Sequence, residues 1–227
     1  MSTEIIRADF DRLALLDRDQ WGHNDHYHAF LLRHIPPDCG QALEIGCGTG
    51  AFARLLAQRS QQVLALDLSP QMIESARARS QGYSNIIFEV ADVLAWEFPR
   101  ERFDCIASIA TLHHLPLERI LKDMRAGLKP GGVLLVLDLF EAQGLAGKLA
   151  GAVALPVSAV LNLAHTGRIR EPRAVRQAWA EHGRNDTYPT VAYVRRVCGR
   201  LLPGAIVRSH LLWRYSIIWH KPTSPAS

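Results

Sequence analysis

The sequence predicts an α/β fold, a doubly wound seven-stranded sheet that is parallel except for an antiparallel last strand. Three observations lead to this prediction. Short apolar runs alternate with helix-period segments from residue 40 onward, a glycine turn follows the first run, and two further apolar runs come near the end of the chain. Runs that are apolar throughout are typical of parallel strands covered on both faces.

Composition limits the alternatives. The chain has 227 residues, is 48% apolar and 21% charged, and could form one core, so we expect a single domain over residues 1–221 and a disordered tail at 222–227. The net charge is +4, but basic and acidic residues alternate along most of the chain, which argues against a DNA-binding protein. The four cysteines form no C-x-x-C pair and are expected to be reduced thiols.

The glycine turn is the centre of the pattern. The apolar run Ala42–Ile45 carries one acid, Glu44, and is followed by Gly46, Gly48 and Gly50. Glycines are needed where a ligand approaches the backbone closely or where φ is positive. Thr49 is expected to cap the next helix, whose inner face is formed by Phe52, Leu55 and Leu56.

A second strand at 62–68 contains Asp67, about 20 residues after the glycines, where nucleotide-binding folds place an acid on ribose hydroxyls. The spacing of the glycines is one residue shorter than the dinucleotide pattern G-x-G-x-x-G. The carboxylate of Glu44 suits a cationic ligand and would repel a diphosphate. We therefore expect no NAD binding.

The later elements follow in regular order. Ser69 is expected to cap a helix that begins with Pro70, and strands are expected at 86–90 and 103–109. Pro116 opens the next helix, LKPGG at 128–132 reads as a turn, and residues 132–140 form the fifth strand. Helices are also expected at 3–17, at about 25–34 and at 190–201, and the closing strands at 207–213 and 214–221.

The pattern Glu44-x-Gly46-x-Gly48-x-Gly50, followed by Asp67, resembles motif I and its successor in the class I S-adenosylmethionine-dependent methyltransferases. D-x-I-x-S at 104–108, LHHLP at 112–116 and LKPGG-x-L at 128–134 extend the resemblance over about residues 40–140. It implies a Rossmann-like fold, a methyltransferase, and S-adenosylmethionine as cofactor with S-adenosylhomocysteine as product. The residues that it implies for cofactor binding are Glu44, Gly46, Cys47, Gly48, Gly50, Asp67, Leu68, Met72, Asp92, Val93 and Ile109.

In this family N-terminal helices lie over the cofactor, so residues 1–39 are expected to form a helical lid over a cofactor-binding core at 40–140. Tyr27 is a candidate cofactor contact, with a plain packing role as the alternative. For removing a proton from the acceptor, the candidates are His113 and His114 after strand four, then His26 and His28. His23, His26 and His28 could also form a metal cluster, but His26 and His28 point to different sides of a helix, so no metal site is expected.

Residues 141–188 are far longer than the connection needs and are expected to form a helical insert over the acceptor site; residues 189–221 hold the final helix and strands. The apolar part, 144–164, is interrupted by Lys148, Pro156, Ser158 and Asn162, so it predicts no transmembrane span. Docking to a membrane surface or a hydrophobic partner is the alternative role, and plain scaffold is the third.

The expected reaction is methyl transfer to a small molecule, with an oxygen or nitrogen nucleophile, by in-line displacement. Two alternatives stay open, an RNA-modifying methyltransferase and a cofactor-binding module without catalysis. Only the arginines near 168–176 favour RNA. The N-terminus lacks the apolar segment of a signal peptide, so a cytoplasmic protein is expected. Its expected oligomeric state is a monomer or a homodimer.

Overall fold

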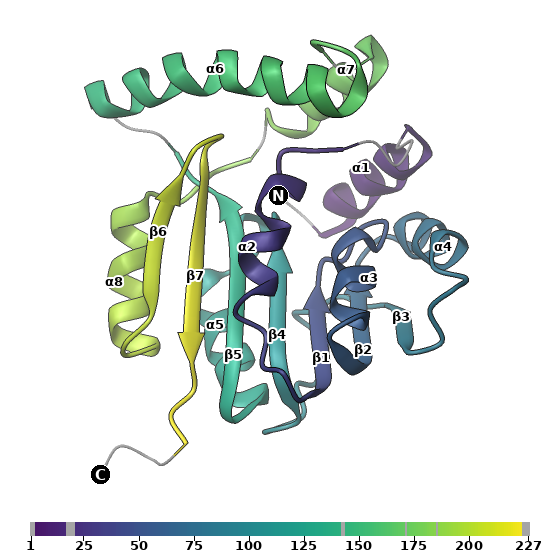
Figure 1. The fold of residues 1–227 in the computed structure, drawn as a ribbon, viewed down its shortest axis with the longest axis vertical. Coiled ribbons are helices and arrows are strands. Elements are labelled where there is room, and N and C mark those ends of the chain that lie inside the picture. The colour runs from purple at the N-terminus through teal and green to yellow at the C-terminus, as the bar shows by residue number, and fades with distance from the viewer. Residues whose placement is uncertain (1–2, 17–20, 142–143, 171, 185, 224–227) are drawn as a thin grey trace.

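The protein, described by a computed structural model that covers residues 3–16, 21–141, 144–170, 172–184 and 186–223, is built around one seven-stranded sheet (Figure 1). The strand order is β3-β2-β1-β4-β5-β7-β6. The strands are β1 (Cys39–Ile45), β2 (Ser60–Asp67), β3 (Ile86–Val90), β4 (Phe103–Ile109), β5 (Leu128–Leu139), β6 (Ile206–His210) and β7 (Arg214–His220).

The first five strands pair in parallel, and β7 lies antiparallel between β5 and β6. The predicted fold class is therefore confirmed. The chain order reverses between β1 and β4, which are neighbours in the sheet. In open α/β sheets this switch point is where a ligand binds, outside the carboxyl ends of the strands.

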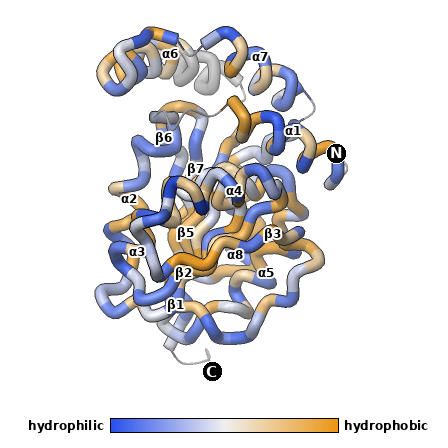
Figure 2. The backbone as a smooth tube through the Cα atoms, turned by 90° about the vertical axis from the view of Figure 1, so that its right-hand side faces the viewer, coloured by the Kyte–Doolittle hydropathy of each residue, from blue (hydrophilic) through white to orange (hydrophobic). Residues whose placement is uncertain are grey.

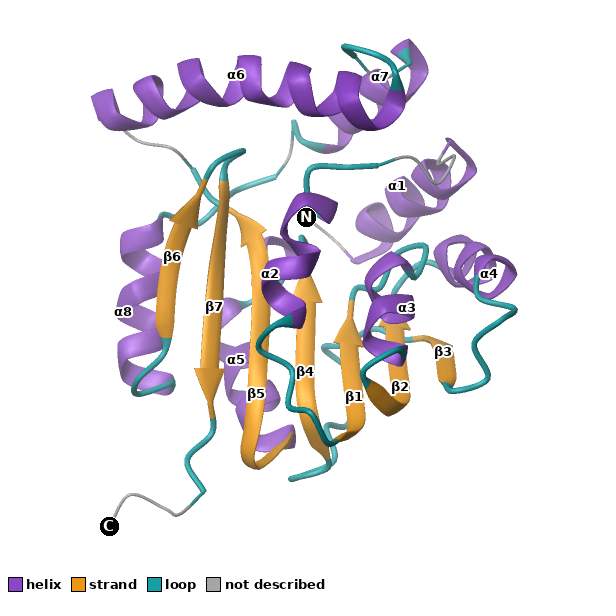
Figure 3. Cartoon of the chain, viewed as in Figure 1, coloured by secondary structure: helices purple, strands orange, loops and turns teal. Residues whose placement is uncertain are grey.

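Helices cover both faces of the sheet (Figure 3). The helices of the described chain are α1 (Thr3–Leu16), α2 (His28–Leu32), α3 (Ala51–Ala57), α4 (Pro70–Arg79), α5 (Leu117–Gly127), α6 (Gly144–Thr166), α7 (Arg173–His182) and α8 (Val191–Leu201), with 3₁₀ turns η1 (Asp25–Tyr27) and η2 (Leu112–His114). The expected helices at 3–17, 25–34 and 190–201 are thus present with small shifts in their ends, the second as η1 followed by α2.

Alternate strand residues separate two cores, because successive side chains of a strand point to opposite faces. Ala42 and Ala107 face the core under α2, α3 and α4, whereas Leu43 and Ile106 face the core under α5 and α8. Figure 2 shows the hydrophobic strands running through the centre of the molecule. Such burial stabilises the domain by roughly 25 cal/mol per Å² of apolar surface.

The start of α4 is as expected from the sequence, and the start of α3 is not. The Ser69 hydroxyl accepts from the Met72 backbone N–H at 3.0 Å, and Pro70 occupies the first turn of α4. By contrast, the prediction that Thr49 caps α3 is wrong, because Gly50 holds the cap position with φ 79°. The predicted turn at 128–132 is also wrong, since these residues form the irregular start of β5.

The insert forms two helices, α6 and α7, and Figure 1 shows α6 lying across the carboxyl ends of the parallel strands. Pro156 lies inside α6, a helix of 23 residues. Within the described part of the chain, no helix is long and apolar enough to cross a membrane. The expected disordered tail lies outside the described residues from 224 onward.

Candidate active site

The glycine turn lies where β1 ends at the switch point of the sheet. Gly46 and Cys47 both donate their backbone N–H to the Leu66 carbonyl, at 2.8 and 2.9 Å, so the turn is fixed to the end of β2. Gly46, Gly48 and Gly50 have φ values of 71°, 52° and 79°. Each therefore occupies the left-handed region that other residues adopt only with strain.

The three glycines differ in what surrounds them. A Cβ on Gly46 would collide with the Thr111 side chain, and one on Gly50 would lie 3.0 Å from the Phe88 ring. Around a Cβ on Gly48 there is no atom within 4 Å. Gly46 and Gly50 are therefore required by packing, whereas the open space at Gly48 would let a ligand approach the backbone.

Asp67 joins this turn to β2. Its Oδ2 accepts from the Gly48 N–H at 2.8 Å and its Oδ1 from the Ser69 N–H at 2.9 Å. Burial raises the pKa of Asp67, and the two backbone hydrogen bonds oppose that rise. Each oxygen keeps a second lone pair, so the carboxylate could still accept from a ribose hydroxyl.

Glu44 lies inside the same site. It is buried, and its Oε2 has no hydrogen-bond partner in the described part of the chain. Burial first, and then the Asp67 carboxylate, raise the pKa of Glu44 well above its usual range. A buried carboxylate beside an open glycine fits a cationic ligand, because such a ligand would restore the charged form of Glu44.

The remaining expected cofactor residues border the same edge of the sheet. After β3, Asp92 Oδ1 accepts from the Leu94 N–H at 2.9 Å, which fixes the turn that carries the buried Val93. Ile109 ends β4, and Leu68 follows Asp67. Met72, in the first turn of α4, also packs with Leu13 and Ala14 of α1. Cys47 is buried within the turn, and burial raises its pKa.

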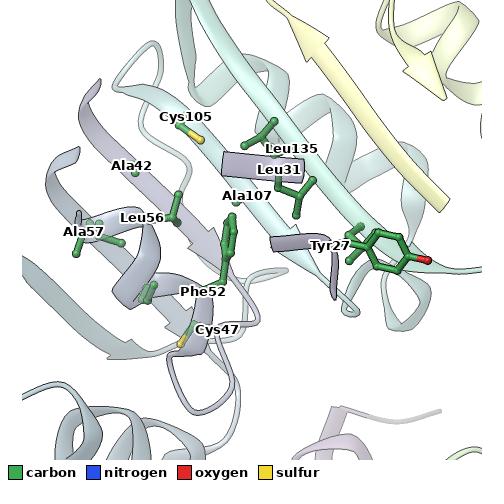
Figure 4. Close-up of a cluster of buried hydrophobic side chains, with 14 of the residues drawn as sticks. Tyr27, Leu31, Ala42, Cys47, Phe52, Leu56, Ala57, Cys105, Ala107 and Leu135 are labelled. Carbon is green, nitrogen blue, oxygen red and sulfur yellow. The ribbon is translucent and has the colours of Figure 1, made fainter. Parts of the chain in front are cut away.

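Tyr27 takes a different place from the other candidates. Its hydroxyl donates to the Leu211 carbonyl at 2.6 Å, in the connection between β6 and β7, and its ring contacts His210. Figure 4 shows the ring pointing away from Cys47 of the glycine turn. In this structure Tyr27 anchors the N-terminal segment to the connection between β6 and β7.

The end of β4 turns sharply toward a second group of polar residues. Ala110 has φ 51°, unusual for a residue with a Cβ, and its N–H donates to the Leu137 carbonyl at 2.7 Å. Such strain is found where the surrounding structure holds a functional geometry. Thr111 follows against Gly46, and η2 then presents His113 and His114.

His113 forms the shortest polar contact of this group. Its Nδ1 lies 2.6 Å from Oδ1 of Asp138, a fully buried residue near the end of β5. A carboxylate only accepts, so Nδ1 donates, and Nε2 is the ring nitrogen that can carry a lone pair. Asp138 therefore selects the tautomer of His113 and fixes its ring.

His114, His182 and Asp186 lie beside this pair. His114 Nδ1 is 3.4 Å and His182 Nε2 is 3.5 Å from the Asp186 carboxylate, while His182 Nδ1 lies 3.2 Å from Asp9 of α1. The Tyr188 hydroxyl donates to Asp186 at 3.3 Å and its ring contacts His113. We call His113, His114, His182, Asp138, Asp186 and Tyr188 the histidine cluster.

The electrostatics of the cluster differ from residue to residue. Burial, followed by the neighbouring His113 and His182, lowers the pKa of His114 to about 3, so this ring is neutral near pH 7. Burial raises the pKa of Tyr188 to about 12, with Asp186 as the next cause. The cluster therefore combines the neutral His114 ring with the buried acids Asp138 and Asp186.

Arg214 supplies a half-buried cation next to the cluster. Its Nε donates to the Asn24 side chain at 2.7 Å and its Nη1 to the Leu212 carbonyl at 2.8 Å. Burial lowers the pKa of Arg214, and the nearby Asp138 opposes this effect. Arg214 thus connects β7 to the N-terminal lid close to Asp138.

The sequence identified His113 and His114 but missed Asp138, His182, Asp186 and Asp9. An acid within the apolar run of β5 was a signal for Asp138, because buried strands rarely carry a charge without a partner. His113, His114 and Asp186 have ligand atoms within 4.8 Å of one another and are the group that could hold a metal among the described residues. From the sequence, His23, His26 and His28 were weighed as a metal cluster, and no metal site was expected.

These three N-terminal histidines separate in the structure. His23 Nε2 lies 2.8 Å from Ser158 Oγ of α6, His28 packs on Phe52 with its Nδ1 3.4 Å from Asp25, and His26 is exposed against Tyr27. Burial lowers the pKa of both His23 and His28. They hold the lid in place at separate points.

Comparison with known proteins identifies the family to which the chain belongs. A family model described as a methyltransferase domain matches residues 42–132. An uncharacterized methyltransferase of Mycobacterium tuberculosis is 30% identical over 206 residues, covering 89% of this chain and 98% of the relative. The trans-aconitate 2-methyltransferase of Methylobacterium radiotolerans is 35% identical over 160 residues, covering 64% of this chain and 58% of the relative.

Among solved structures, the N-methyltransferase NodS of Bradyrhizobium japonicum in complex with S-adenosylhomocysteine has a TM-score of 0.66 at 19% identity, covering 95% of this chain and 98% of that chain. This likeness supports the fold. The match over nearly the whole length of the mycobacterial relative, together with the glycine turn, Glu44 and Asp67, fixes the family. The chain belongs to the class I S-adenosylmethionine-dependent methyltransferases.

Proposed function

We propose that this enzyme methylates an oxygen or nitrogen atom of a small molecule, and that His113 removes the proton of that nucleophile. The observation that supports the proposal most is the 2.6 Å contact between His113 and the buried Asp138. A ring fixed in this way presents Nε2 as the proton-accepting atom. General base catalysis of this kind contributes typically 10²–10⁴-fold in rate.

S-adenosylmethionine supplies a methyl group that its sulfonium already activates, so the protein mainly has to align the reactants and exclude water. The residues that would hold it are the glycine turn with Glu44, then Asp67 and Leu68 after β2, Met72, Asp92 with Val93, and Ile109. Glu44 would face the positive charge of the ligand and Asp67 its ribose. Tyr27 would act indirectly, by holding the lid to the sheet.

The histidine cluster supports a small acceptor. His182 and Asp186 reach the cluster from α7 and the segment after it, so the insert contributes polar groups to the same edge of the sheet as the glycine turn. Such enclosed, convergent polar groups are typical of small-molecule sites. The relative named for trans-aconitate, itself a small molecule, is consistent with this class of acceptor.

An acceptor screen with isotope-labelled S-adenosylmethionine would test the proposal, followed by variants on the acceptor found. We expect His113→Gln and Asp138→Asn to lower the transfer rate by about 10²–10⁴-fold and to leave cofactor affinity within a few-fold. His220→Gln, at an exposed position at the other end of β7, is the matched control. A His113→Gln enzyme that keeps its full rate would remove His113 from the reaction.

A further inference from the structure

The outer face of α6 is an unusual surface. Leu155, Val160 and Leu163 are 64%, 66% and 51% exposed, and the neighbouring Pro156 and Ala164 are exposed as well. At 3.6 residues per turn these side chains fall within one half of the helix. A water-facing helix surface is normally polar, and a helix that is apolar all round is normally buried or in contact with lipid.

The inner face of α6 is firmly seated, which fixes the orientation of the outer face. Ala154 is buried and Leu161 packs on the main core. Ser158 contacts His23 at 2.8 Å, and the His165 ring stacks on Trp21 with centroids 4.5 Å apart. Rotation of the helix would break these contacts, so the apolar residues on the other side remain outside.

Positive charge is concentrated in the same part of the chain. Residues 142–170 contain no aspartate or glutamate, but they contain Lys148, Arg168 and Arg170. The next segment, 171–176, adds Arg173 and Arg176 against one acid, Glu171. The side chains of all four arginines are exposed.

These features lie together at one end of the molecule. Figure 1 shows α6 and α7 at the top, and Figure 2 places them there in the view turned by 90°. The exposed Ile169 and Trp179 belong to the same region, at 59% and 48%. We call Leu155, Val160, Leu163, Ile169 and the four arginines the outer patch.

We propose that the outer patch docks this enzyme onto the surface of a bilayer that contains anionic lipids, with α6 lying in the interface. An apolar helix face next to clustered arginines matches the two attractions that hold peripheral proteins at such a surface, burial of apolar area and attraction of cations to anionic headgroups. A neutral protein partner would use the apolar residues and leave the charge pattern unexplained. The proposal does not depend on which base removes the proton of the acceptor.

The test is sedimentation of the full chain with phosphatidylcholine vesicles, with and without about a third of phosphatidylglycerol. We expect binding to the anionic vesicles that weakens with salt, since screening shortens the reach of surface charge. Each arginine near such a surface contributes about 1 kcal/mol, so Arg168→Gln with Arg170→Gln should lower the partition coefficient roughly 30-fold. Leu155→Ser with Leu163→Ser should abolish binding.

Ile87→Ser is the matched control, because Ile87 is 49% exposed on the edge strand β3, far from α6 in Figure 1. Melting curves of all variants show whether they remain folded. The proposal is overturned if folded wild-type protein stays in the supernatant with anionic vesicles, or if the leucine and control variants bind equally. A dimer that forms with rising protein concentration and is lost in the leucine variant, without vesicle binding, would make the patch an interface between two copies.

Discussion

The carboxylate of Asp67 accepts the backbone N–H of Gly48 across 2.8 Å, which joins the end of β2 to the open position of the glycine turn. The same side chain accepts from Ser69, at the cap of α4. One acid thus orders both the turn that a ligand approaches and the helix that follows. The proposed role of Asp67 in ligand binding and its role in the fold are therefore linked.

Asp67→Ala should weaken the binding of S-adenosylhomocysteine roughly 10- to 100-fold, because a charge-assisted hydrogen bond contributes about 1.5–3 kcal/mol. Isothermal titration calorimetry measures the change. Asp67→Asn, which keeps one acceptor oxygen for a backbone amide, is the control for disorder of the turn. Unchanged affinity in a folded Asp67→Ala protein would mean that the ribose is held elsewhere.

NAD should not bind at this turn. The glycines lack the spacing that sets a pyrophosphate on a helix N-terminus, and the buried Glu44 would meet a diphosphate with like charge. Titration of NAD should give no heat and should not displace S-adenosylhomocysteine. Micromolar NAD binding that S-adenosylhomocysteine competes away would contradict the assignment of the turn.

Glu44→Gln should raise the stability of the ligand-free enzyme and lower its affinity for the cofactor. The pKa of Glu44 is raised on folding, so the folded state binds more protons than the unfolded state above pH 4.5, and stability falls as pH rises from there toward the folded pKa. Removing the charge should raise the unfolding free energy at neutral pH by about 1 kcal/mol or more, which is about 2–4 °C in melting temperature.

Melting scans across pH, with and without S-adenosylhomocysteine, measure both effects of this variant. The gain over wild type should shrink as pH falls toward 4.5, the ordinary pKa of the side chain. The shift produced by the ligand should also be smaller in the variant. A Glu44→Gln variant that melts lower than wild type at neutral pH and keeps the full ligand shift would contradict both expectations. The charge on Glu44 would then neither destabilise the ligand-free enzyme nor contribute to ligand binding.

Replacing residues 144–188 with a short linker should abolish transfer to the native acceptor and leave cofactor affinity within a few-fold. The segment contributes His182, Asp186 and Tyr188 to the histidine cluster, whereas the candidate cofactor residues, apart from Tyr27, lie between 44 and 109. Stability should fall, because Leu13 and Ala14 of α1 lose their contact with Ala178.

Asp186→Ala and Tyr188→Phe therefore accompany the replacement as milder variants that keep α7. Both should lower the transfer rate while the melting temperature changes little. If the shortened protein remains folded and methylates the native acceptor at full rate, the insert is scaffold and the acceptor site lies elsewhere.

The sequence predicted those parts of the fold that depend on neighbours in the chain. Ser69 and Pro70 begin α4 because a hydroxyl and a fixed φ act locally, and the short apolar runs placed the strands correctly. At the start of α3, Thr49 and Gly50 have similar cap preferences, and the cap is Gly50, whose φ of 79° favours glycine. The LKPGG segment joined β5 because of a contact far along the chain: Gly131 donates its backbone N–H at 2.8 Å to the carbonyl of Lys221, directly after β7.

The histidine cluster shows where prediction from the sequence ends. His113, Asp138 and His182 of the cluster, and Asp9 beside it, come from four separate segments, and no periodic pattern connects them. Their meeting depends on the position of α1 against α7, which only the packed structure determines. For Tyr27 the sequence left a cofactor contact and a packing role open, and only the structure shows that its hydroxyl donates to Leu211.

The most direct test of the account is a single-turnover reaction with methyl-labelled S-adenosylmethionine, a cell extract separated into small molecules and RNA, and the wild-type, His113→Gln and His220→Gln proteins. The account predicts that label enters one small molecule with wild-type and His220→Gln protein, at a rate that His113→Gln lowers by about 10²-fold or more. Label on RNA, or bound cofactor with no transfer to either fraction, would contradict it.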